Sequence, residues 1–180
     1  MNHEKSPKAH PRNPPLPEPW LRGTKTEVPA VPLAVLHALE LAHEDLQEWC
    51  GELTAQELNQ RPAGLPPVAF HLRHIARSLD RLLTYAEGRR LSEEQLAKLK
   101  SEMEPGVTPD SLFAELTTAL KASSERIRTL ATTDLEQSRT VGNKGLPTTL
   151  GGLLVHVADH TQRHVGQAVT TAKIIAAQRT

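Results

Sequence analysis

Apolar residues recur three or four positions apart along four long segments of this 180-residue chain, which is the pattern of amphipathic helices. The segments span about residues 32–50, 68–87, 109–130 and 150–177, and prolines or glycines separate them. No window shows sustained two-residue alternation, so we expect little or no sheet. The pattern predicts an all-α fold, a four-helix bundle with a short extra helix between the second and third long helices, from Ser92 to about Met103.

Residues 1–28 differ from the rest of the chain in composition. Eight of the fourteen prolines lie before residue 33, and proline disfavours helix interiors. We expect residues 1–28 to form an irregular Pro-rich N-terminal arm that docks through Trp20 and Leu21, and residues 29–180 to form the helical bundle. Residues 132–147 are predicted to form a long loop before the last helix.

The charge balance and the single cysteine exclude several classes of protein. Lysine plus arginine and aspartate plus glutamate both number 21, so the formal net charge is zero. Without a basic stripe or clustered aromatic residues, we expect no nucleic-acid partner. No apolar run approaches the roughly 18 residues of a membrane span, and the first residues lack the apolar core of a secretory signal. With Cys50 as the only cysteine, no internal disulfide can form, and we expect a cytoplasmic protein.

Five of the nine histidines lie in two of the predicted helices. His156, His160 and His164 recur every fourth residue, which places them on one helix face, and His71 and His74 lie in the second long helix. Burying imidazole without a polar partner is costly, whereas two helices that donate histidines to one ion satisfy those groups. We therefore predict that His74, His160 and His164 bind a divalent transition metal and leave one position for water or substrate.

Two stretches of the sequence resemble the DinB/YfiT-like family of metal-binding bundle proteins. They are FHLRHIARSLDRLLTYAEG and, far downstream, GGLLVHVADHTQRHVGQAVTTAKI, and the similarity covers about residues 30–178. His74 matches the family's histidine in the second helix, and His160 and His164 match its histidine pair before Gly166-Gln167. The resemblance implies a divalent ion, most often nickel or zinc, and a homodimer. It also implies, for some members, thiol S-transferase activity with a low-molecular-weight thiol.

The other histidines have less defined roles in the sequence. His156, one turn before His160, is the best catalytic candidate as a general base, but a place beside the ligands, in the core or at the surface is equally open. His71 lies about 60° from His74 around its helix, so we expect it at the rim of the site. We expect His43 not to reach the metal and His37 to be solvated.

Three neutral imidazoles leave a divalent ion its full charge, which lowers the pKa of a bound water or thiol. The first hypothesis is therefore a metal-dependent enzyme acting on a small molecule by thiol transfer or by hydrolysis. The alternative is a metal-binding or stress-response bundle protein without turnover. A third hypothesis is an interaction module in which the buried histidines are only structural.

Overall fold

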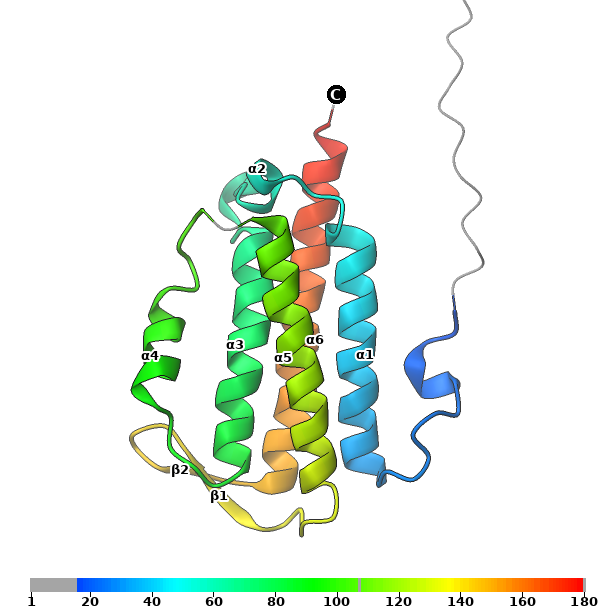
Figure 1. Cartoon of the computed structure of the whole chain (residues 1–180), viewed down its shortest axis with the longest axis vertical. Helices are drawn as coiled ribbons and strands as arrows, with labels where there is room; N and C mark the ends of the chain where they lie inside the picture. Colours follow the sequence, from blue (N-terminus) through cyan, green and yellow to red (C-terminus); the bar gives the residue numbers. More distant parts are fainter. Residues whose placement is uncertain (1–15, 107, 180) are drawn as a thin grey trace, which may run out of the picture.

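Four long helices lie side by side and form the body of the molecule (Figure 1). The computed structural model describes residues 16–106 and 108–179. The predicted all-α four-helix bundle is confirmed, and the short extra helix lies where the sequence places it. Along the chain, the elements are η1 (Pro19–Leu21), α1 (Ala30–Cys50), α2 (Ala55–Leu58), η2 (Pro62–Gly64), α3 (Val68–Ala86), α4 (Glu93–Lys100), α5 (Pro109–Leu130), β1 (Ser138–Val141), β2 (Leu146–Thr149) and α6 (Leu150–Ala177).

The core lies between the four long helices and consists mainly of aliphatic side chains. α1 and α3 each pack against both α5 and α6, so every long helix has two neighbours in the bundle. Leu79, Leu116 and Leu154, on three different helices, are completely buried. Leucine, alanine, valine and isoleucine dominate the buried set, because the chain has few aromatic residues. The bundle is thus stabilised by burial of aliphatic surface from all four helices.

Side-chain caps mark where several helices begin. The hydroxyl of Thr149 accepts a hydrogen bond from the backbone N–H of Gly152 and so fixes the first turn of α6. The threonine before α5, Thr108, caps that helix in the same way. Full capping boxes, in which side chain and backbone bond reciprocally, begin two shorter helices and pair Thr54 with Glu57 and Ser92 with Gln95. Of the two helices that carry the clustered histidines, α6 thus has a side-chain cap, whereas α3 begins after Pro67 without one.

The prediction that residues 132–147 form a loop is wrong, because part of this segment forms a β-hairpin. β1 pairs antiparallel with β2, from Ser138 opposite Thr149 to Val141 opposite Leu146. The turn between them has Gly142 at φ 72° and Gly145 at φ 60°, a conformation that glycine adopts easily. Strands of four residues are too short to give a two-residue alternation that stands out in a sequence. Both strands of this hairpin are also only partly buried.

The N-terminal segment packs on α1 in a different way from the one predicted. Trp20 and Leu21 are exposed, so the prediction that they dock on the bundle is wrong. Pro19 is buried instead, and Arg22 pairs with Glu40 at 3.0 Å and with Glu44 at 2.6 Å. The hydrogen bond from Arg22 lowers the pKa of Glu44. Polar pairs, rather than aromatic burial, thus hold residues 16–28 against α1; residues 1–15 of the predicted arm lie outside the described residues.

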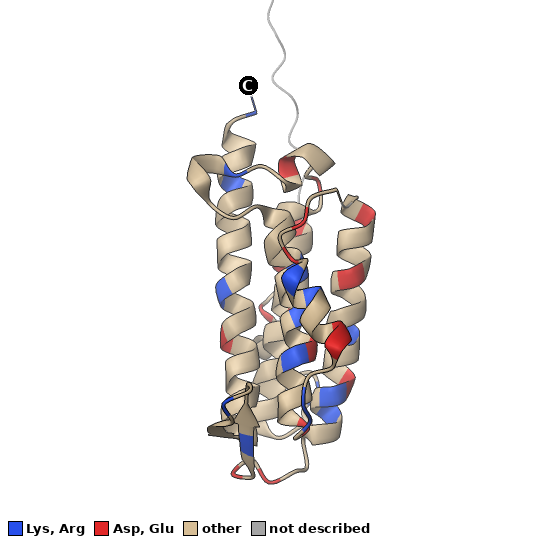
Figure 2. Ribbon diagram, turned by 90° about the vertical axis from the view of Figure 1, so that its left-hand side faces the viewer, with Lys and Arg blue, Asp and Glu red and all other residues tan. Residues whose placement is uncertain are grey.

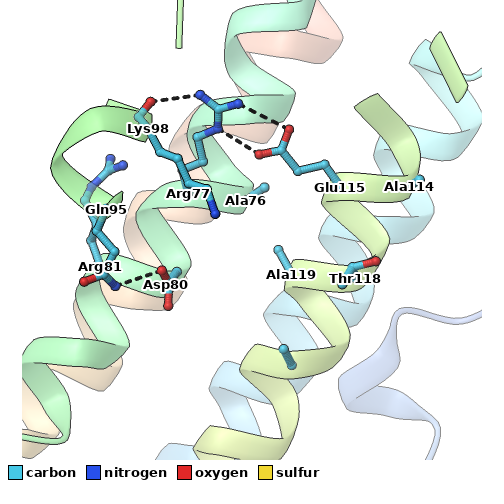
Figure 3. A pocket seen from close by; sticks show the side chains of 11 residues that line it. Ala76, Arg77, Asp80, Arg81, Gln95, Lys98, Ala114, Glu115, Thr118 and Ala119 are labelled. Carbon is cyan, nitrogen blue, oxygen red and sulfur yellow. Dashed lines mark hydrogen bonds and ion pairs between the residues drawn. The ribbon is translucent and has the colours of Figure 1, made fainter. Parts of the chain in front are cut away.

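The short helix α4 is fixed against α3 by polar side chains, and one of them, Arg77, also reaches α5 (Figure 3). Arg77 on α3 donates to the backbone carbonyl of Lys98 at 2.8 Å and to the carboxylate of Glu115 on α5 at 2.8 Å. Gln95 on α4 donates to Asp80 at 2.8 Å. These contacts hold the end of α4, and the chain that follows it, beside the middle of α3.

Charged residues are unevenly distributed over the molecule. Figure 2 shows lysine, arginine and acidic residues gathered around α4 and its neighbours, whereas α6, which leads to the C-terminus, carries few. Within the described part of the chain, no helix has the length and apolarity needed to span a membrane.

Replacing Leu79 by alanine should destabilise the bundle. Leu79 is 0% exposed, so its truncation removes buried aliphatic surface and leaves a cavity, at a cost of about 2–5 kcal/mol. Urea denaturation followed by circular dichroism would measure the loss. Leu96→Ala on α4 is the matched control, since Leu96 is 44% exposed, and an equal loss in both variants would contradict the assigned core.

Candidate metal centre

Three half-buried imidazoles meet where α3 packs against α6. α3 carries His74, and α6 carries His160 and His164 one turn apart. The Nε2 atoms of His74 and His160 are 3.3 Å apart, and the ring of His164 lies 4.2 Å from that of His74 between centroids. One potential ligand atom from each of the three residues lies within 4.8 Å of the other two. The structure thus brings together the three residues that the sequence singled out.

The spacing of these nitrogens fits a tetrahedral metal ion. Two nitrogens bound to one zinc ion at about 2.0–2.1 Å lie roughly 3.4 Å from each other in tetrahedral geometry. The 3.3 Å separation of the His74 and His160 Nε2 atoms matches that edge. Without a cation, at most one of the two nitrogens could donate to the other, whereas an ion accepts both lone pairs. The donor set therefore suits a divalent transition metal that accepts imidazole.

Burial keeps two of the ligand candidates, His160 and His164, unprotonated. Desolvation is the largest cause that lowers the pKa of His160 to about 4, and the neighbouring His164 and His74 lower it further. Desolvation likewise lowers the pKa of His164 to about 4, with contributions from His74 and Arg163. Both rings are consequently neutral at pH 7, which is the state that binds a metal.

A buried carboxylate holds His74 from the side opposite to the other imidazoles. Oε2 of Glu102, which lies just after α4, is 2.7 Å from Nδ1 of His74, and its Oε1 accepts from Arg81 at 2.7 Å. Burial alone would raise the pKa of Glu102, but hydrogen bonds from His74 and Arg81 outweigh it and lower that pKa. A carboxylate on Nδ1 orients the ring and leaves Nε2 to face the other two histidines. Sequence reasoning missed this residue because it lies in an irregular segment 28 positions from His74.

His71 is part of the same cluster, and the prediction that it lies at the rim is wrong. The residue is 1% exposed, and its Nδ1 is 3.1 Å from Nδ1 of His164. Phe70 stacks on His74 with ring centroids 5.2 Å apart and meets His71 edge-on at 5.1 Å. Burial lowers the pKa of His71 to about 4, helped by His164 and His74. The contact with His71 occupies Nδ1 of His164 and leaves its Nε2 for an ion.

His156 lies outside this group of three, toward the surface. Its ring centroid is 5.5 Å from that of His160, and 46% of its side chain is exposed. Nδ1 is 3.9 Å from the carboxylate of Asp159, which also accepts from Arg163 at 2.7 Å. The ring is thus placed between solvent and one of the ligand candidates.

The other singled-out residues lie away from the centre. His43 lines a groove between α1 and α5 together with Lys25, as expected for a residue that does not reach the cluster. The prediction that His37 is solvated is wrong, because it is 8% exposed: α1 packs on two helices and buries a wider face than its apolar stripe marks. Cys50 is fully buried, and burial raises the pKa of its thiol to about 12, so it is no thiolate nucleophile at neutral pH.

The fold and the site define a class of protein, a four-helix bundle with three histidines from its second and fourth long helices. Comparison with known proteins assigns the superfamily. Residues 38–168 match the DinB superfamily, and the chain belongs to that superfamily. Among solved structures, a conserved protein from Enterococcus faecalis is similar, at 23% identity and a TM-score of 0.56 over 80% of this chain and 96% of that one. That likeness supports the fold alone. The comparison with curated proteins gave no match.

Replacing Glu102 by glutamine should weaken metal binding without unfolding the protein. The amide keeps the volume but cannot accept from both His74 and Arg81 as the carboxylate does, so the orientation of His74 is less well held. Loss of such a partner typically weakens metal binding by about 10–100-fold. Competition with a chelator of known affinity would measure the change. Glu104→Gln, two residues further on and exposed, is the matched control; equal affinities in the two variants would rule out the role assigned to Glu102.

The metal-free protein should lose stability in mild acid. The folded chain holds His71, His160 and His164 with pKa values of about 4, whereas the unfolded chain binds protons at the ordinary 6.5. The unfolded state therefore binds more protons between these values, and the free energy of unfolding falls as the pH falls from 6.5 toward 4. Urea denaturation in the presence of a chelator, at a series of pH values, would measure this fall. A smaller fall is expected for His71→Phe, and the same fall in both proteins would contradict the assignment to His71.

Proposed function

We propose that this chain binds a divalent transition metal, zinc or nickel, through His74, His160 and His164 and uses it to act on a small molecule. The convergence of the three imidazoles is the observation that carries the proposal. Membership of the DinB superfamily is compatible with a metal-binding protein. The reaction we favour is thiol transfer from a low-molecular-weight thiol, with hydrolysis as the other reaction that such a site supports.

The number of ligands favours an enzyme over a passive metal-binding or stress-response protein. Among residues 16–106 and 108–179, the group of potential ligands has three members and no fourth histidine, cysteine or carboxylate joins it. Structural zinc sites have four protein ligands, whereas catalytic sites have three and keep one position open. When bound, the ion would supply the positive charge that lowers the pKa of a thiol or water in that position.

The chain's own residues would orient the ligands and move protons. Glu102 would fix the ring of His74, and Phe70 would shield the cluster from water on one side. His156 would take up a proton at a ring nitrogen and pass it to solvent, because its ring lies between His160 and the surface. Asp159 would stabilise the protonated ring of His156.

Elemental analysis of protein purified without a histidine tag tests the metal site. We expect about one equivalent of zinc or nickel in the natural chain and less than about 0.1 equivalent in His74→Ala or His160→Ala, with the fold retained. His43→Ala is the matched control, since His43 lies in a different groove, and it should keep its metal. Full metal content in either ligand variant would overturn the assignment.

Turnover is tested on the same proteins. Conjugation of cysteine to chlorobimane would report thiol transfer, and hydrolysis of p-nitrophenyl acetate would report the second reaction. We expect one of these rates to depend on added zinc or nickel and to fall in His74→Ala, and the rate of His156→Ala to fall while its metal content stays. A fully loaded protein without either activity would favour the passive metal-binding protein.

A further inference from the structure

A groove of about 440 Å³ lies next to the histidine cluster, where the segment before α3 meets α6. Apolar atoms form most of its surface. Its walls come from the segment before α3 and from α6, and they include Leu65, Pro66, Arg163, Gly166 and Gln167. His71 also lines it, so one residue contacts both the groove and the ligand candidate His164.

The hydrogen-bond chain from the cluster determines which nitrogen of His71 carries the proton. If Nε2 of His164 binds the ion, the neutral ring carries its proton on Nδ1 and donates it to Nδ1 of His71, 3.1 Å away. The neutral ring of His71 must then carry its proton on Nε2. That atom is buried and has no hydrogen-bond partner within the described residues. A buried donor without a partner is unfavourable, so an acceptor in the groove would satisfy it.

Gly166 leaves the groove open although the helix does not require a glycine there. It lies inside α6, where glycine lowers helix stability relative to alanine. A Cβ atom built at Gly166 would meet nothing within 4 Å, and the residue has no positive φ. Packing and backbone conformation therefore do not explain this glycine, whereas space for a bound molecule does.

The polar side chains that line the groove offer donors and no carboxylate. Among its described lining residues none is acidic, and one of them is Arg163. The ion pair of Arg163 with Asp159 engages Nη2, at 2.7 Å, out of the five N–H donors of a guanidinium. A guanidinium and an imidazole N–H together match the two oxygens of a carboxylate.

We propose that this groove binds a small carboxylate with an apolar body, whose oxygens accept hydrogen bonds from Nε2 of His71 and from Arg163. The inference rests on the proposed metal site, because metal binding at His164 fixes the tautomer of His71. Metal and carboxylate should consequently strengthen each other's binding by the same factor, as thermodynamic linkage requires. The proposal places the acidic end of the substrate beside the metal centre.

Titration of the full chain with sodium benzoate, followed by NMR and calorimetry, tests the groove. Benzamide is the matched uncharged probe. We expect saturable binding of benzoate, with chemical-shift changes at the amides of Gly166 and Gln167, and binding of benzamide weaker by about tenfold. Zinc loading should increase the affinity for benzoate by about fivefold or more.

Two variants and one control test whether benzoate binds in the groove and whether His71 links its binding to zinc. Gly166→Leu fills the groove and should abolish benzoate binding while keeping stoichiometric zinc. Ala176→Leu adds the same side chain at an exposed position further along α6 and should bind benzoate normally. His71→Phe should retain weak binding but lose the dependence on zinc.

The outcomes distinguish this inference from the metal site itself. Stoichiometric zinc with no benzoate binding, or with equal binding in Gly166→Leu, would overturn the carboxylate groove and leave the metal site intact. Benzoate binding that is unaffected by zinc would overturn the link through His71. Absence of zinc binding would instead overturn the proposed function, and the benzoate titration of the metal-free protein would still report on the groove.

Discussion

The axial register between α3 and α6 is the constraint on which the rest of the structure depends. His74 on one helix must lie level with the turn between His160 and His164 on the other, because their nitrogens meet within 4.8 Å. Each residue along a helix advances about 1.5 Å and turns the side chain by about 100°, so a slip of one residue would separate the rings. Close packing of buried aliphatic side chains on both helices, such as Leu72 and Val157, holds that register.

The sequence was informative wherever a feature repeats along one helix. Apolar spacing predicted the four long helices, and the prolines and glycines between them marked where they are separated. The i,i+4 spacing of His160 and His164 predicted a shared face, the second histidine-bearing helix offered His74 as the partner across the bundle, and the likeness to a known family matched the same three residues. These properties are local, or follow from an inherited fold, so one chain is enough to predict them.

Other features depend on packing between segments that are distant in the chain, and such packing cannot be inferred from a single sequence. Glu102 reaches His74 only because α4 docks on α3. In the sequence, Glu102 lies in a polar segment that looks like an ordinary solvent-exposed loop. His71 and His37 are buried because α3 and α1 each contact two or more helices, which widens the buried face beyond the apolar stripe. Trp20 is exposed because Arg22 and its two glutamates determine how the N-terminal segment lies.

The attachment of α4 has a consequence for how fast an ion could leave the protein. α4 has no buried residue and is held by side-chain contacts that involve Arg77 and Gln95, while Arg73 and Arg81 contact Glu102, just after it. Such a segment can open locally at a much smaller free-energy cost than the whole bundle. Opening it would release His74 from its carboxylate while the four long helices stay packed. The exchange rate of a bound ion would then depend on the opening of α4 and the residues that follow it, and the scaffold could be emptied and refilled without being unfolded.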